Sequence, residues 1–151
     1  MRARRIVLIA AGVVVFLAIS SVLARWLSAE GAERGQIEQA IRAEAAGNAT
    51  GLVRALSGCA GRPACVAQAR ADAARLRRPG QVLILAYDSA TAHALSSRTG
   101  LTRVAWKTPS TLPVVQCALV RRKGNAVSGM SVSLLRLSPP IRRTANCVTR
   151  R

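Results

Sequence analysis

Four cysteines are the residues of this sequence best suited to covalent chemistry. Cys59, Cys65, Cys117 and Cys147 make an even number, which is typical of a disulfide framework in a protein exported to an oxidising compartment. Of the three possible connectivities, Cys59 with Cys65 can close locally around Gly-Arg-Pro, which leaves Cys117 for Cys147. A zinc site is the weaker alternative, because the chain has no C-x-x-C pair and one histidine, so we expect no metal.

The single histidine, His93, follows Asp88 by five residues and lies among serine and threonine residues. These residue types can form a nucleophilic constellation, but no G-x-S-x-G turn occurs and residues 89–151 contain no second acid. We therefore expect His93 to be an exposed loop residue, and we expect neither an enzyme nor a cofactor. The glutamates of the juxtamembrane region are predicted to form a solvated helix face: Glu30, Glu33, Glu38 and Glu44.

The excess of cations is the sharper chemical feature. The 151 residues carry 23 Lys and Arg against 6 Asp and Glu, a formal net charge of +17, and no acid follows Asp88. The densest cluster, Arg121, Arg122 and Lys123, precedes Gly124-Asn125 and is predicted to be a hairpin turn that displays its side chains.

Two further cations, Arg103 and Lys107, are two strand steps apart and should face the same side of a sheet. Such a basic half attracts anions, so we expect an anionic lipid, a phosphate-bearing wall polymer or an acidic protein as partner. Aromatic residues, which stack on bases, make up 3% of the chain, so nucleic acid ranks below these partners. A compositional origin stays open, because arginine outnumbers lysine 21 to 2 and strand cations also protect sheet edges.

An uncharged apolar run over residues 6–24 is long enough for a helix that crosses the ~30 Å core of a bilayer. Arg2, Arg4 and Arg5 precede it, which predicts a cytoplasmic N-terminus with the remainder outside. We expect a cytoplasmic tail (1–5), a transmembrane signal-anchor (6–26), a connector or helix extension (27–35), an extracytoplasmic domain (36–147) and a basic tail (148–151). A signal peptide cleaved after Ala24 is the alternative, and it would leave the domain secreted.

Beyond this run the hydrophobic period changes once. Helical spacing predicts helices from 36 to the Gly47-Asn48 stop, over 49–57, and from Pro63 to Pro79-Gly80. Strands are predicted over 82–87, 101–108, 114–120 and 130–134, the first buried on both faces and the last followed by a bulge at Leu134-Leu135. Helices first and a meander afterwards give an α+β fold, with two or three helices packed on a four-stranded antiparallel sheet.

This order of elements resembles the cystatin-like and nuclear-transport-factor-like cone folds of single-pass bacterial membrane proteins. Mce-associated proteins and inner-membrane assembly proteins of type IV secretion look similar in outline. The resemblance covers residues 36–141 and implies one helical layer on a curved sheet. A cone of this kind can enclose a small apolar ligand lined by Tyr87, Trp106, Met130 and Val132, which at strand spacing are also ordinary core positions.

The sequence thus predicts a non-enzymatic, membrane-anchored extracytoplasmic module that contacts an anionic envelope component or a protein partner through its basic β half. A small-ligand carrier or sensor that uses the interior of the cone is the second hypothesis. A filled core with a continuous basic face favours the first hypothesis, and a roomy apolar cavity under the sheet favours the second.

Overall fold

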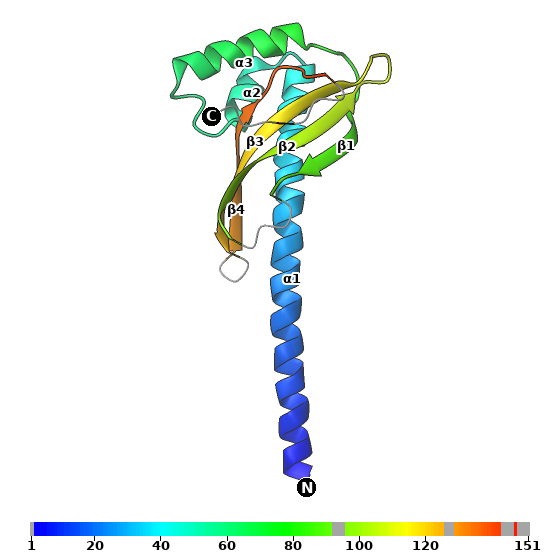
Figure 1. The fold of residues 1–151 in the computed structure, drawn as a ribbon, viewed down its shortest axis with the longest axis vertical. Helices are drawn as coiled ribbons and strands as arrows, with labels where there is room; N and C mark the ends of the chain where they lie inside the picture. The colour runs from blue at the N-terminus through cyan, green and yellow to red at the C-terminus, as the bar shows by residue number, and fades with distance from the viewer. Residues whose placement is uncertain (1, 92–95, 126–128, 143–146, 148–151) are drawn as a thin grey trace.

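A computed structural model describes residues 2–91, 96–125, 129–142 and 147 of the chain; His93 lies outside them. Helices come first and a four-stranded antiparallel sheet follows, so the α+β prediction is confirmed (Figure 1). In chain order the elements are α1 (Arg2–Ala45), α2 (Ala49–Ala55), α3 (Pro63–Arg75), β1 (Leu83–Ser89), β2 (Arg98–Lys107), β3 (Val114–Asn125) and β4 (Gly129–Leu137).

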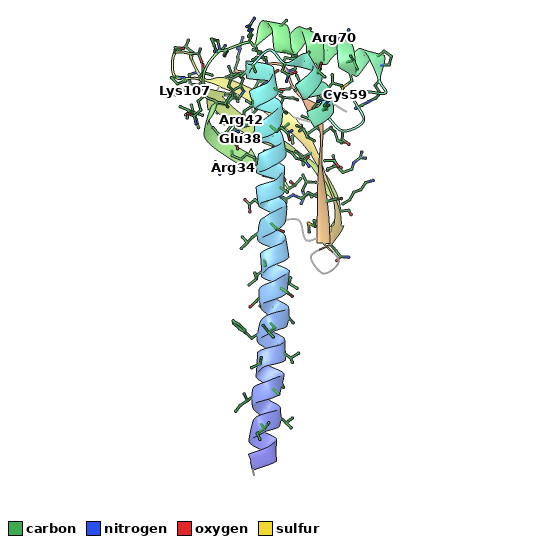
Figure 2. All side chains as sticks on the ribbon, turned by 180° about the vertical axis from the view of Figure 1, so that it is seen from behind. Arg34, Glu38, Arg42, Cys59, Arg70 and Lys107 are labelled. Carbon is green, nitrogen blue, oxygen red and sulfur yellow. A yellow bond between two sulfur atoms is a disulfide. The ribbon has the colours of Figure 1, made fainter. Side chains whose placement is uncertain are left out.

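The longest element, α1, runs without a break from the apolar segment into the domain (Figures 1 and 2). Its stretch Ile6–Ala24 is long and apolar enough to cross a membrane, and none of its most apolar window is buried against the rest of the chain. Phe16, for example, is 68% exposed. Soluble proteins rarely leave so large an apolar surface uncovered, which suits a membrane span or a signal sequence. The segment 27–35 is helical, as the extension of the membrane helix would be.

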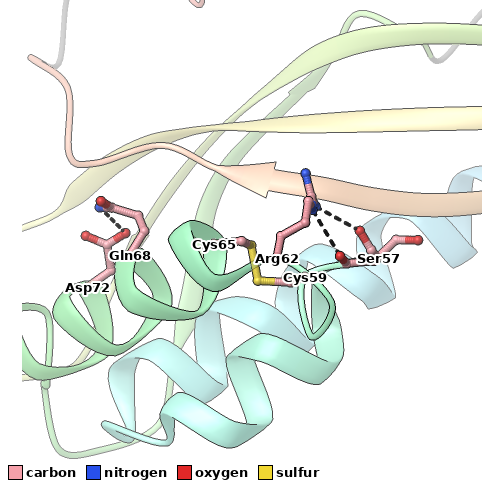
Figure 3. Close-up of a disulfide and its surroundings, with 7 residues drawn as sticks. Ser57, Cys59, Arg62, Cys65, Gln68 and Asp72 are labelled. Atoms are coloured by element: carbon pink, nitrogen blue, oxygen red, sulfur yellow. Dashed lines mark hydrogen bonds between the residues drawn. A yellow bond between two sulfur atoms is a disulfide. The ribbon is translucent and has the colours of Figure 1, made fainter.

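The helix boundaries follow local signals in the sequence. α1 ends at Ala45, shortly before Gly47, whose φ of +70° is a left-handed conformation that glycine adopts without strain. Asn48 then caps α2, because its side chain accepts a hydrogen bond of 2.8 Å from the Gly51 amide. The predicted disulfide between Cys59 and Cys65 is present and closes the connection from α2 to α3 (Figure 3).

The sheet is a meander in which each strand pairs with the next. In β4 the register shifts between Leu134, which pairs with Val120, and Arg136, which pairs with Leu119. This leaves Leu135 as the extra residue of a bulge, where the sequence predicted one.

The first strand, β1, corrects one expectation. Its continuous apolar run predicted burial on both faces, yet Leu83 and Leu85 are 40% and 51% exposed. β1 is an edge strand in the sheet order. One helical layer covers one face of the meander, so the outward residues of β1 meet solvent.

The core lies between the sheet and the second half of α1, with α2 and α3 at the end far from the N-terminus (Figure 1). α1 also covers the edge of β4, because the Gln36 amide donates to the Val132 carbonyl (2.9 Å) and accepts from the Leu134 N–H (3.1 Å). A side chain thus occupies the place of a neighbouring strand, which protects this edge from pairing with another chain.

The second predicted disulfide, between Cys117 and Cys147, is also present, with 5.7 Å between the two Cα atoms. Cys117 alternates along β3 with the inward residues Gln116 and Ala118, so it belongs to the outer face of the sheet. An isolated bridge between Val115 and Ile141 holds the segment that follows β4. The disulfide and the bridge together hold the C-terminal segment to β3.

Candidate anion-binding surface

A buried carboxylate, Glu33, joins α1 to the sheet. Its Oε1 accepts hydrogen bonds from the hydroxyls of Thr102 (2.6 Å) and Ser89 (2.8 Å), and its Oε2 accepts one from Thr91 (2.6 Å). The Nε of Arg122 donates a hydrogen bond to the same Oε2 at 2.8 Å, and its Nη2 forms an ion pair with that oxygen at 2.7 Å. Both charged side chains are 0% exposed. Four donors around one carboxylate compensate for the loss of hydration that burial imposes.

This geometry corrects the prediction for Arg122. The residue was expected in an exposed turn with Arg121 and Lys123, but β3 continues to Asn125, so the three residues alternate across a strand. Arg122 therefore shares the inner face with Val120 and Ala118, while Arg121 and Lys123 are exposed. The strand parity of Val120 was the signal in the sequence that places Arg122 inward.

The acids of α1 require a second correction, because Glu33 and Glu44 are 0% and 1% exposed rather than solvated. Helical spacing puts both on the face of Ile37 and Ile41, the buried apolar residues of this helix. Helical spacing could therefore have predicted that Glu33 and Glu44 are buried. The prediction was wrong because it assumed that acidic side chains stay in water.

The pKa of Glu33 shows how the cluster is stabilised. Burial by itself raises the pKa of this carboxyl, but hydrogen bonds from Thr102, Thr91, Arg122 and Ser89 outweigh burial and hold the pKa below its ordinary value. Burial and the negative charge of Glu33 raise the pKa of the neighbouring Tyr87 hydroxyl. Glu33, Arg122 and the hydroxyls of Ser89, Thr91 and Thr102 thus bond to one another, whereas the buried Tyr87 hydroxyl has no hydrogen-bond partner among the described residues.

A second polar contact joins α1 to β3 further from the apolar span. Gln116 donates from Nε2 to Glu44 Oε2 (2.9 Å) and accepts at Oε1 from the indole of Trp106 (2.6 Å). Burial raises the pKa of Glu44 to about 7, against the opposing hydrogen bond from Gln116 and with a further increase from the charge of Asp72. Glu44 thus keeps a proton at pH values where an exposed glutamate has lost it.

The other predicted surface cations lie on the outer face of the sheet. Arg121 pairs in register with Thr99 of β2 and Ser133 of β4, and Lys123 pairs with Ser131, so small hydroxyl residues flank both cations. Arg103 and Lys107 share this face and are half-buried. Three exposed cations lie at one end of β2 and β3 and form the basic end of the domain: Arg98, Arg121 and Lys123.

The predicted pocket residues lie in the core or beside it. Trp106 is fully buried in the core, and Tyr87 and Val132 pack against that core. Met130 is half-buried in β4.

A groove of about 680 Å³ lies instead between α2, α3 and strands β3 and β4. Its apolar lining includes Leu52, Leu56, Leu119, Leu135 and Leu137. Charged residues of both signs also line it: Arg62, Arg121, Arg136, Glu44 and Asp72. Figure 3 shows Arg62 at this place, where it donates to the carbonyls of Ser57 and Gly58.

Among the described residues, no group of three or more His, Cys, Asp and Glu could hold a metal ion. Asp88, which precedes His93 by five residues in the sequence, is exposed in β1 and pairs in register with Arg103. Comparisons with protein-family models, curated proteins and solved structures find no match to this chain. The resemblance to cone-fold membrane proteins therefore stays a prediction.

The Glu33–Arg122 pair predicts that a single substitution of Arg122 destabilises the protein more than the substitution of both residues. Arg122→Met should lower the free energy of unfolding by about 3–5 kcal/mol, because it leaves a buried carboxylate without its cation. Adding Glu33→Gln should restore part of that loss, since a neutral amide still accepts from Thr102. Urea unfolding of the full-length protein in detergent, followed by near-ultraviolet circular dichroism, measures both effects. Lys123→Met, one residue away but exposed, is the control and should stay within about 0.5 kcal/mol. Equal effects of Arg122→Met and Lys123→Met would contradict the buried pair.

The pKa of Glu44 predicts that the domain loses stability as pH rises. The folded state binds this proton up to about pH 7, whereas the unfolded state releases it near 4.5, so the stability that Glu44 contributes is fully present below 4.5 and is lost through that window. The loss is at most about 3 kcal/mol. Glu44→Gln should remove most of the difference between unfolding at pH 5 and at pH 8. An unchanged pH dependence in this variant would show that Glu44 titrates normally.

Proposed function

We propose that this protein is a non-enzymatic, membrane-anchored extracytoplasmic module that binds an anionic envelope component or an acidic protein. This proposal rests mainly on one observation: half of the acids are buried, whereas most strand cations are exposed or half-buried. Of the six acids, Glu33, Glu44 and Asp72 are buried. Arg98, Arg121, Lys123 and Arg136 are exposed on the strands. The domain surface is therefore more basic than the composition alone indicates, which favours anionic partners.

The Glu33 cluster supports a binding role over a catalytic one. It is the place where a carboxylate, a guanidinium and several hydroxyls converge, as they do in many active sites. Here the side chains of Glu33 and Arg122 are 0% exposed and their hydrogen bonds are made to each other and to Thr102. A substrate would have to enter a closed core to reach them.

Retention of the apolar segment as an anchor is the second part of the proposal. Ala24 lies inside α1, and the same helix continues to Ala45 within the core. Proteases cut exposed loops more readily than continuous helices, which favours an uncleaved span. The two disulfides support a domain outside the cytoplasm.

The groove between α2, α3 and the sheet favours a second candidate function, the carrier or sensor of a small apolar ligand. Its volume of about 680 Å³ falls in the range of small-molecule sites, and its leucines supply apolar contact. Its charged residues, three arginines and the acids Glu44 and Asp72, would pair with a polar end of the ligand. A ligand held there would lie between α2, α3 and the last two strands rather than inside a cone.

The anchor predicts an intact N-terminus in the mature protein. The mass of the protein purified from membranes should include residues 1–24, and alkaline carbonate should not extract it. A mature chain that begins at Arg25 would contradict the anchor and leave export unaffected.

The basic end predicts salt-sensitive retention on phosphocellulose. Full-length protein with Arg121→Gln and Lys123→Gln should elute at lower salt than the wild type, because two of its three exposed cations are lost. Arg70→Gln with Arg77→Gln, which removes the same charge from exposed positions in and after α3, is the matched control. An equal shift in both variants would mean that the charge is compositional. Retention that ignores salt and both pairs of substitutions would contradict the proposed function.

A further inference from the structure

The two polar contacts between α1 and β3 fix the direction of the sheet relative to the apolar span. Glu44, near the end of α1, bonds Gln116 near the start of β3, and Glu33, earlier in α1, bonds Arg122 near the end of β3. β3 therefore runs back along α1 toward the span. Figure 1 shows the end of β3 and the start of β4 on the side of the domain that faces the N-terminal part of α1.

The height of the basic end above a bilayer follows from helix geometry. With Ile6–Ala24 in the membrane, the nine residues 25–33 raise Glu33 and its partner Arg122 by about 14 Å at ~1.5 Å per residue. Headgroups occupy roughly 5–7 Å of that distance. The remaining gap of about 7 Å is within the ~8 Å screening length of physiological salt. Lys123 comes next along β3, nearer to the bilayer than Arg122.

The charges at this level are mostly positive. Arg98 pairs in register with Arg122, and Arg121 and Lys123 are its neighbours on β3, so the whole basic end lies within one residue of the contact with Glu33. Arg34 is exposed on α1 at the same level (Figure 2). The acids at this end that remain outside the buried cluster are Glu30, half-buried on α1, and Asp88, exposed on β1.

From this placement we infer that the basic end binds anionic lipid headgroups of the leaflet from which α1 emerges. The inference rests on the proposed function and names its partner. A lipid surface lies beside the basic end at all times, whereas a wall polymer or an acidic protein must diffuse to it, so the tether favours lipid through effective concentration. Each cation near an anionic surface contributes about 1 kcal/mol, a roughly fivefold change in the ratio of bound to unbound orientations. A change in the tilt of α1 is sufficient to bring the basic end down.

The test uses the full-length protein in lipid nanodiscs with a fluorescent label at a new cysteine, Ser131→Cys, opposite Lys123. All four native cysteines are in disulfides, so the new thiol labels selectively. Lipids with a nitroxide on the headgroup quench a label that approaches the surface. Quenching should be stronger in bilayers with phosphatidylglycerol than in phosphatidylcholine alone. It should return to the phosphatidylcholine level at high salt or with Arg121→Gln and Lys123→Gln, which together should lower the bound ratio by one order of magnitude or more.

Two controls separate the lipid partner from the general anion site. A label at Ser110→Cys, exposed in the β2–β3 connection at the far end of the domain, should not respond to phosphatidylglycerol. Arg70→Gln with Arg77→Gln should leave the response at Ser131→Cys intact. Quenching that is independent of phosphatidylglycerol, or of the Arg121 and Lys123 substitutions, would overturn the lipid inference. If the same preparation keeps its site-dependent retention on phosphocellulose, the proposed function stands and the partner is a polymer or an acidic protein. If that retention also fails, the proposed function fails with it.

Discussion

The buried ion pair between Glu33 and Arg122 is the constraint on which the arrangement of this protein depends. It joins residues 89 positions apart in the chain. A buried pair of this kind is weak evidence for net stability, because desolvation offsets most of the attraction, but a wrong register that separates the two charges is strongly disfavoured. Three hydroxyl donors, from Ser89, Thr91 and Thr102, specify the position further. The pair therefore selects one placement of the helix on the sheet.

The features that could be predicted from the sequence are those that local residues determine. Gly47 and Asn48 end one helix and begin the next, and the broken alternation at Leu134-Leu135 marks a bulge, because each depends on neighbours in the chain. The short spacing of Cys59 and Cys65 settled both disulfides by elimination. The burial of Glu33 and Arg122 could not be found this way, since each looks solvated until its distant partner is known. Helical spacing points Glu33 inward, but strand parity points Arg122 inward only if β3 extends past Val120, where the sequence predicted a turn.

The burial of acids links the interior of the domain to its surface chemistry. Glu33 offsets the charge of one inward arginine, and burial keeps Glu44 partly protonated near neutral pH, so these carboxylates do little to offset the cations outside. Successive residues of β3 point to opposite faces of the sheet, which puts Arg121 and Lys123 on the opposite face from Arg122. The same strand alternation therefore buries Arg122 and exposes Arg121 and Lys123. A basic surface follows from how the fold distributes charge as well as from composition.

The same contact also lies where α1 is intrinsically weakest. Gly31 and Gly35 flank Glu33, and glycine in a helix interior costs roughly 1 kcal/mol relative to alanine. Open space surrounds both positions where a Cβ would stand, so packing does not require glycine at either one. The bonds from Glu33 to the sheet, and those of Gln36 to β4, hold the helix through this stretch. Where helix propensity is low, tertiary contacts therefore keep α1 continuous, and that continuity ties the orientation of the basic end to the orientation of the apolar span.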